Sequence, residues 1–155
     1  MPHAYSRNYV HIIFGTKGRR RCIKTPLQHT LWKYLAGICL EYGAEVNAIG
    51  GVEDHVHMLL CIPPKLSVAA LVRALKANSS KWMNETGHFF SWQEGYACFS
   101  VSASNRDSVA EYVRNQANHH HKRTFGEEWE ALLRKHGIES RSEARASALA
   151  ETVST

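Results

Sequence analysis

The chain has 155 residues, of which 44% are hydrophobic and 21% are charged, and its formal net charge is +5. This composition is typical of a folded domain and excludes a disordered chain, and no apolar run approaches the ~20 residues of a membrane span. Because an apolar signal-peptide core is also missing, we expect a cytoplasmic protein with no membrane partner, whose four cysteines are reduced thiols.

The basic residues gather in the first part of the chain. Residues 1–40 carry seven Lys and Arg side chains and no acidic one, whereas the last residues are mildly acidic. Four of the seven bases lie in one short loop and are Lys17, Arg19, Arg20 and Arg21. Such density favours a polyanionic partner, although a solvated charged surface would look the same in sequence.

The first elements are a strand, a helix and a second strand. Aromatic and β-branched residues at 9–14 predict the strand, and the basic loop follows it. Thr25 is typical of a helix cap, apolar residues then recur at helical spacing, and Gly43 is typical of a helix end. Residues 45–49 predict the second strand.

A hairpin and a second helix come next. Residues 54–62 predict a third strand, which the glycine-rich segment 50–53 would join to the second strand as a tight turn. Ser67 is expected to cap the second helix, and Gly87 lies just past its end.

A fourth strand and a third helix complete the predicted order. Residues 96–101 alternate as a strand, and Asn105 or Asp107 would open the helix. The order β-α-β-β-α-β-α predicts an α+β fold whose first six elements form a ferredoxin-like (RRM-like) split βαβ unit, an antiparallel sheet with two helices on one face. We expect one domain over residues 1–136, and a weakly helical or disordered tail over 137–155.

The third predicted strand contains the pattern His55-Val56-His57. Side chains alternate along a strand, so both imidazoles project from one face and can converge on one metal ion. Taken alone, such a short pattern is more typical of ordinary half-buried strand residues than of a metal site.

The third predicted helix contains Tyr112 and Gln116. Residues four apart lie on one face of a helix, so a phenol, which can act as a nucleophile, is presented beside an amide oxygen suited to Mg²⁺ or Mn²⁺. Taken alone, the pair is more typical of a core tyrosine beside a surface glutamine.

Together and in this order, the two patterns resemble those of a known family. Asp54-His-Val-His-Met-Leu-Leu60 is similar to the His-hydrophobic-His motif of HUH endonucleases. Glu111-Tyr-Val-Arg-Asn-Gln116 is similar to the Tyr-x-x-x-Gln helix of the single-tyrosine transposases of the insertion sequence 200/605 family. The similarity extends over roughly residues 5–125, and residues 1–136 would then be a single HUH tyrosine transposase domain.

This resemblance implies a DNA strand transferase. Tyr112 would attack a phosphodiester of single-stranded DNA near a hairpin and form a 5′-phosphotyrosine link. His55, His57 and Gln116 would hold one Mg²⁺ or Mn²⁺. The resemblance also implies a homodimer in which the tyrosine helix of one subunit completes the metal site of the other, whereas the sequence itself leaves docking in cis or in trans open.

The positions of the basic side chains fit such a substrate. The predicted DNA contacts are Lys17, Arg19, Arg20 and Arg21 of the loop and Arg73, Lys76 and Lys81 of the second helix. His119, His120 and His121 cannot all bind one metal and are expected to face DNA or solvent, while His11 is expected to be structural.

Three other interpretations stay open at this point. REP-associated tyrosine transposases, which are domesticated relatives, share the two motifs. A non-catalytic ferredoxin-like module that binds nucleic acid is the second alternative, although such modules present aromatic residues where this chain has His55 and His57. A small metal-dependent hydrolase or redox sensor is the third, and it gives no reason for Tyr112 and Gln116 to lie four residues apart.

Overall fold

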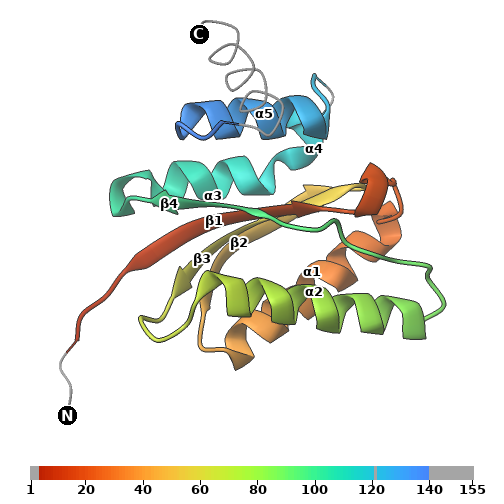
Figure 1. The fold of residues 1–155 in the computed structure, drawn as a ribbon, viewed down its shortest axis with the longest axis horizontal. Coiled ribbons are helices and arrows are strands. Elements are labelled where there is room, and N and C mark those ends of the chain that lie inside the picture. Colours follow the sequence, from red (N-terminus) through yellow and green to blue (C-terminus); the bar gives the residue numbers. More distant parts are fainter. Residues whose placement is uncertain (1–3, 121, 140–155) are drawn as a thin grey trace, which may run out of the picture. The chain divides into compact units, whose positions relative to one another are not determined.

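The structure is a computed structural model that describes residues 4–120 and 122–139 (Figure 1). These residues form two compact units, divided between His119 and His120. The strands of the first unit are β1 (Asn8–Gly15), β2 (Glu45–Val52), β3 (His55–Ile62) and β4 (Ala97–Val101). Its helices are α1 (Thr25–Glu41), α2 (Val68–Glu85), α3 (Arg106–Arg114) and α4 (Gln116–His119), with 3-10 turns at Lys17–Arg19 and Ala103–Asn105.

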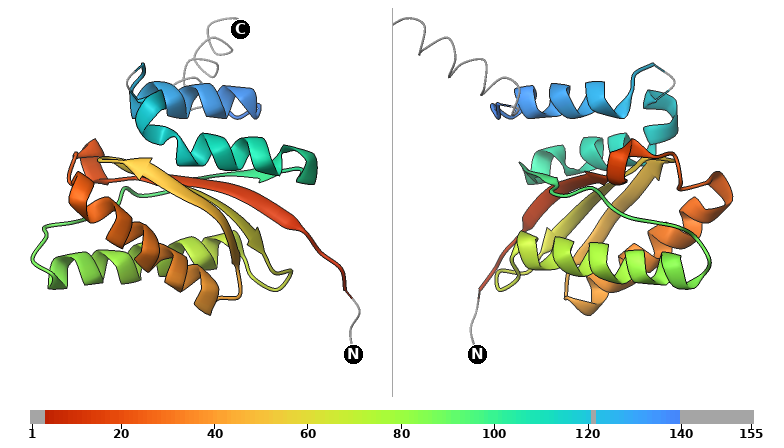
Figure 2. Two further views of the ribbon diagram at one scale, coloured as in Figure 1. Left: turned by 180° about the vertical axis from the view of Figure 1, so that it is seen from behind. Right: turned by 45° about the vertical axis from the view of Figure 1, so that its right-hand side comes forward.

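The four strands form one antiparallel sheet in the order β2-β3-β1-β4. The helices α1 and α2 cover one face of this sheet, and α3 lies across the other (Figures 1 and 2). This arrangement confirms the predicted α+β, ferredoxin-like split βαβ fold with an added helix. The two strands that carry the predicted site and the basic loop, β3 and β1, are therefore neighbours at the centre of the sheet.

Alternation along β3 divides its side chains between the two faces. Val56, Met58 and Leu60 are fully buried in the main apolar core, which also contains Leu35 of α1 and Leu75 of α2. The intervening positions belong to the other face, where a smaller apolar cluster packs against α3. Its buried members are Tyr9, Ala48, Leu59, Cys61, Ala110 and Val113. The α3 face is thus the less apolar one, and it is the face that carries the histidines.

The predicted turn between β2 and β3 is wrong in its position. Gly50 and Gly51 lie inside β2, and the two-residue turn is Glu53-Asp54. The glycines are required by packing, because a Cβ on Gly50 would overlap the carbonyl oxygen of Val113 in α3. Residue 50 pairs with His57 in the sheet, so this close approach lowers α3 directly onto the histidine pair.

The predicted third helix is interrupted at Asn115, whose φ and ψ are −97° and 27°. Tyr112 lies in the last turn of α3, and Gln116 begins α4. The two residues nevertheless stay together, because the Gln116 side-chain amide donates to the Tyr112 carbonyl oxygen at 3.1 Å. A side-chain hydrogen bond thus bridges the interruption.

The second unit contains α5 (Phe125–Lys135), a helix that sequence reasoning left unassigned. The Thr124 hydroxyl accepts from the Glu127 backbone N–H at 3.2 Å, which is a regular helix cap. One turn further along, the Glu128 carboxylate lies 3.3 Å from a ring nitrogen of His120.

Most of the predicted tail, residues 140–155, and His121 lie outside the described residues. The prediction of a single domain over 1–136 stays a prediction. Within residues 4–120 and 122–139, no helix is both long enough and apolar enough to cross a bilayer.

Candidate active site

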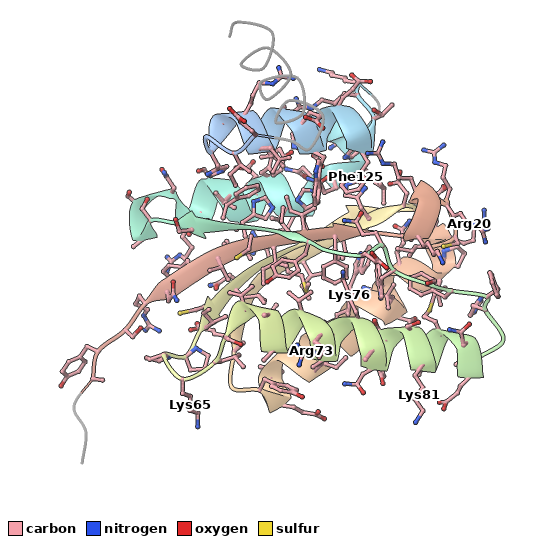
Figure 3. The ribbon with its side chains drawn as sticks, in the orientation of Figure 1. Arg20, Lys65, Arg73, Lys76, Lys81 and Phe125 are labelled. Atoms are coloured by element: carbon pink, nitrogen blue, oxygen red, sulfur yellow. The ribbon has the colours of Figure 1, made fainter. Side chains whose placement is uncertain are left out.

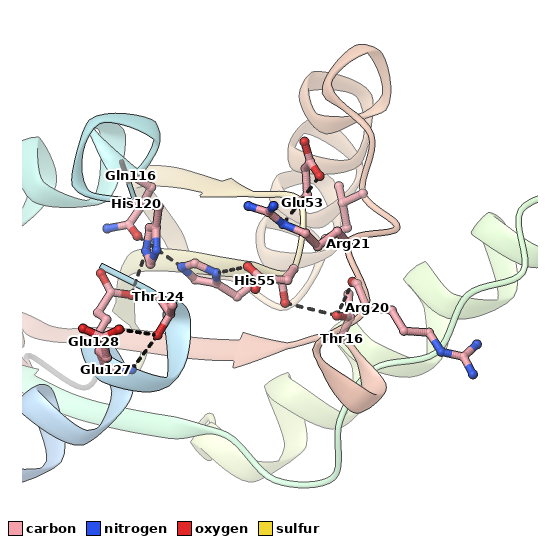
Figure 4. A network of polar contacts seen from close by, with 12 residues as sticks. Thr16, Arg20, Arg21, Glu53, His55, Gln116, His120, Thr124, Glu127 and Glu128 are labelled. Carbon is pink, nitrogen blue, oxygen red and sulfur yellow. Dashed lines mark hydrogen bonds and ion pairs between the residues drawn. The ribbon is translucent and has the colours of Figure 1, made fainter. Parts of the chain in front are cut away.

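His55 is held by hydrogen bonds at both ring nitrogens. Its Nδ1 lies 2.7 Å from the Asp54 carboxylate, and its Nε2 lies 3.2 Å from Oε1 of Gln116 (Figure 4). An ionised carboxylate can only accept, so Nδ1–H donates to Asp54, and in the neutral form of the ring the lone pair is then on Nε2. Asp54 therefore selects the tautomer that turns a basic nitrogen toward Gln116.

Gln116 presents an oxygen to that nitrogen. Its NH₂ group donates to the Tyr112 carbonyl, which fixes the orientation of the amide and places Oε1 against His55. Both side chains are fully buried. Oε1 accepts from Nε2–H when the His55 ring is protonated, and it lies beside the Nε2 lone pair, 3.2 Å away, when the ring is neutral. A buried ring nitrogen and a buried amide oxygen thus lie together, and both are atom types that bind divalent cations.

His57 adds a second imidazole. One of its ring nitrogens lies within 4.8 Å of one of His55, and the ring is fully buried on the same face. Its Nδ1 lies 2.8 Å from Nε2 of His11, a buried side chain of β1. When Nδ1–H of His57 donates to His11, Nε2 of His57 keeps its lone pair for a metal.

The contact to His11 was missed by sequence reasoning, which assigned that residue no partner. A usable signal exists in the sheet pattern. His11 lies on the same face of β1 as Tyr9 and Ile13, because side chains two residues apart project to the same side. The register pairs His11 with Leu59 and Ile13 with His57. His11 is consequently the diagonal neighbour of His57 on the same face, within reach of a long side chain.

Tyr112 packs against these imidazoles. The centre of its half-buried ring lies 5.8 Å from that of His57 and 6.1 Å from that of His11. His119 of α4 covers it from another side, with ring centres 4.6 Å apart. A phenol, two imidazole nitrogens and an amide oxygen are thus gathered from β3, α3 and α4 on one face of the sheet.

The donor set fits a divalent cation. Imidazole nitrogens of His55 and His57 and the amide oxygen of Gln116 make three neutral ligands with oxygen and nitrogen donors, and Mg²⁺ or Mn²⁺ accepts such ligands with water or phosphate oxygens completing the shell. The four cysteines are free thiols, and burial raises the pKa of Cys39 to about 12 and that of Cys98 to about 11. These two thiols stay protonated and are poor metal ligands at neutral pH.

The basic loop adjoins the site. The Thr16 backbone N–H and hydroxyl both donate to the Asp54 carbonyl oxygen, at 2.9 and 3.2 Å. Lys17, Arg19 and Arg20 are exposed in the loop, and Arg19 adopts a left-handed φ of 55°. Arg21 instead turns to Glu53, with 3.8 Å between the charged groups (Figure 4).

The three predicted contacts on α2 lie on the opposite face of the sheet (Figure 3). Arg73 is exposed, and Lys81 is paired with Glu85 at 3.9 Å. Lys76 is half-buried, donates to the carbonyl oxygens of Gln93 and Gly95, and has a pKa lowered mainly by burial. The structure therefore gives Lys76 a role in fixing the segment before β4.

Comparisons with known proteins agree with this geometry. Residues 4–116, more than half of the chain, match the family model described as "Transposase IS200 like". The chain is 28% identical over 116 residues to the transposase for insertion sequence element IS200 of Salmonella typhimurium, a match that covers 68% of this chain and 74% of that protein. It is 27% identical over 124 residues to the ISDra2 transposase TnpA of Deinococcus radiodurans, which covers 74% of this chain and 86% of that one.

Two solved structures share the fold. A crystal structure described as that of a transposase from Deinococcus radiodurans matches with a TM-score of 0.61 and 25% identity, over 75% of this chain and 95% of that chain. A REP-associated tyrosine transposase solved with a REP hairpin matches with a TM-score of 0.56 over 73% of this chain and 68% of that chain, and its 15% identity extends the likeness to the fold alone. With its family model, relatives and fold in agreement, this chain belongs to the IS200-like transposase family.

Proposed function

We propose that this transposase cleaves and rejoins single-stranded DNA at hairpin-marked element ends through a covalent link between Tyr112 and the DNA 5′ phosphate. One observation carries the proposal: the Tyr112 ring packs on His57, while Gln116, held by the Tyr112 carbonyl, faces His55. A phenol, two imidazoles and an amide from distant segments meet on one face of the sheet, which supports the proposed roles of nucleophile and metal ligands. A core that needed only packing would have no reason to bury so many polar groups together.

The proposed reaction exchanges one phosphoester for another. The Tyr112 phenol loses its proton, its oxygen bonds to phosphorus, and the bond from phosphorus to the 3′ oxygen breaks. That oxygen takes a proton and leaves as a free 3′-hydroxyl. Because the number of phosphoester bonds is unchanged, attack by a 3′-hydroxyl on the phosphotyrosine rejoins strands without an energy cofactor.

His55, His57 and Gln116 would hold the divalent cation, Mg²⁺ or Mn²⁺. When bound, the cation polarises the scissile phosphate and stabilises the charge that develops on it. Asp54 and His11 orient the two imidazoles, each by a hydrogen bond to Nδ1. The hydrogen bond from the Gln116 side-chain amide to the Tyr112 backbone carbonyl ties the residue that carries the nucleophile to one of these ligands.

The proposed partner is single-stranded DNA with hairpin ends. The structural neighbour solved with a REP hairpin supports the choice of a hairpin. The exposed basic side chains of the loop lie beside the site, where they can contact phosphates, and are Lys17, Arg19 and Arg20. A homodimer in the cytoplasm stays part of the proposal. Within one chain α3 packs on β2 and β3 of its own sheet, and in the proposed homodimer the same helix would complete the site of its own or of the partner subunit.

A test compares two tyrosine variants on hairpin oligonucleotides copied from the DNA that flanks the gene. With Mg²⁺ or Mn²⁺ present, the wild type and Tyr42→Phe, a change at the end of α1, should give a protein–DNA adduct on a denaturing gel. Tyr112→Phe should bind the hairpin but form no adduct, and a chelator should abolish the wild-type adduct.

Two results would overturn the proposal. An adduct formed by Tyr112→Phe would exclude this nucleophile, and cleavage that persists in chelator would exclude the cation. Binding with no cleavage in either metal would favour the non-catalytic module. The domesticated alternative predicts many copies of the recognised hairpin across the genome, instead of one at each end of the gene.

A further inference from the structure

A pocket of about 310 Å³ opens at the end of β1, outside the cluster of histidines. Its lining residues are Lys17, Gly18, Arg20, Cys22, Phe89 and Ser91. The volume is at the lower end of the range for small-ligand sites. Two of the lining side chains are cationic, one is aromatic and none is acidic, which favours an anionic ligand with a flat apolar part.

Phe89 is the unusual member of this lining, because it is a large apolar residue that is 84% exposed. The next residue, Phe90, is buried, and its ring packs against that of Trp92 with centres 4.7 Å apart. These two anchors fix the segment before β4. Phe89 therefore faces outward although the segment that carries it is anchored in the core.

Arg20 completes a recognition pair with this ring. Its guanidinium carbon lies 5.8 Å from the centre of the Phe89 ring, within range of a cation–π contact (the labelled Arg20 in Figures 3 and 4 marks this end of the sheet). An aromatic face beside a guanidinium is the combination that proteins use to stack an unpaired base and to neutralise its phosphate.

Backbone hydrogen bonds tie the walls of the pocket together. The Lys17 N–H donates to the Ser91 carbonyl at 2.9 Å, and the Gln93 N–H donates to the Gly15 carbonyl at 2.8 Å. The pocket is thus formed before any ligand binds, so little ordering entropy opposes binding there.

The pocket is also joined to the candidate active site by one residue. The Thr16 hydroxyl shares its one proton between the Arg20 carbonyl oxygen at 2.7 Å and the Asp54 carbonyl oxygen at 3.2 Å, and the Asp54 side chain orients His55 (Figure 4). The pocket and the histidines are therefore held by the same short stretch of chain, which is compatible with one DNA strand reaching both.

We propose that this pocket binds one unpaired nucleotide of the DNA substrate, with its base stacked on Phe89 and its phosphates held by Lys17 and Arg20. The inference rests on the proposed function and specifies how the strand is held beside the cleavage site. A paired base cannot offer its face to Phe89, so the pocket selects single-stranded DNA over duplex.

The test measures binding of a short fluorescein-labelled oligothymidylate to the full chain at several salt concentrations. Phe89→Leu, which keeps an apolar side chain but removes the stacking face, should weaken binding roughly tenfold and leave the salt dependence unchanged. Arg20→Gln should weaken binding and reduce the slope of log K against log salt by about 0.7, the value for one lost phosphate contact. Tyr5→Leu, another highly exposed aromatic, and Lys33→Gln on α1 are matched controls that should bind as the wild type does.

A crosslink gives an independent readout. Oligothymidylate that carries 5-iodouracil should attach to Phe89 on irradiation, in the peptide between Lys81 and Arg106. Wild-type affinity of Phe89→Leu, or crosslinks that map only elsewhere, would overturn the pocket and leave the Tyr112 adduct as evidence for the proposed function. A wild type that binds no single-stranded DNA would contradict both.

Discussion

The two faces of the sheet perform different tasks with the same strands. On β3, Met58 and Leu60 point into the apolar core under α1 and α2, while His55 and His57 point toward α3. Side chains alternate along a strand, so one strand can supply stability on one face and buried polar chemistry on the other. Changes on the α1 and α2 face should therefore affect the free energy of unfolding, and changes on the α3 face should affect cleavage and metal binding.

The basic residues show the same division. Lys17 and Arg20 are exposed in the loop beside the site, whereas Lys76 is drawn onto backbone carbonyls on the α2 side and lies over the Phe14 ring. Two regions with similar charge in the sequence therefore differ in whether the cation is available to a phosphate.

The largest expected contrast is between His57→Ala and Leu60→Ala. His57→Ala removes a proposed metal ligand and should slow cleavage by roughly a thousandfold. Leu60→Ala leaves a cavity in the main core and should lower the free energy of unfolding by about 2–5 kcal/mol, while the folded fraction cleaves at a near wild-type rate. Single-turnover cleavage and urea denaturation measure the two effects. The division of the faces fails if Leu60→Ala impairs cleavage by folded protein as strongly as His57→Ala does.

A smaller effect is expected when His11 is replaced. His11→Phe keeps an aromatic ring but removes the hydrogen bond to His57 Nδ1, and it should weaken Mn²⁺ binding about 10- to 100-fold, because the ring is no longer oriented. Isothermal titration calorimetry measures this without any reaction. His29→Phe, on the exposed surface of α1, is the control. Unchanged Mn²⁺ affinity would mean that His11 only fills space beside Tyr112.

The smallest effect concerns the approach of α3 to the sheet. Gly50→Ala inserts a Cβ against the Val113 carbonyl, so α3 must shift, and it should cost about 1–3 kcal/mol of stability. Gly37→Ala in α1 meets no atom within 4 Å and should stabilise the chain by up to about 1 kcal/mol. Thermal denaturation of both variants checks the pair. Equal effects would show that the added Cβ is accommodated and that the approach of α3 does not require a glycine at position 50.

Much of the fold could be predicted because its signals are local. Alternating apolar residues marked the strands, and Ser67 caps α2 as expected, accepting from the Ala70 N–H. The glycines at 50 and 51 misled the turn prediction because a sequence shows that glycine permits a turn, and does not show that a distant helix needs the space. The interruption of the helix at Asn115 was not predicted either. The Gln116 side chain bridges it with a hydrogen bond to the Tyr112 carbonyl, so the two residues stay together as they would in a continuous helix.

The site could be predicted only in part. His55, His57, Tyr112 and Gln116 came from two short patterns whose resemblance to a family gave them weight. His11 was not found, because its pairing with His57 depends on which faces β1 and β3 share and on their register. The exposure of Phe89 also depends on the burial of its neighbours, which no local pattern reports.

Mass spectrometry of the trapped adduct identifies the residue that is joined to the DNA. After nuclease and trypsin digestion of the wild-type complex, the account predicts that residual nucleotide is attached to Tyr112, within the peptide 107–114. The chain has six tyrosines, so the assignment is not trivial. Nucleotide attached to any other residue, or a complex that dissociates fully in denaturant, would contradict the account.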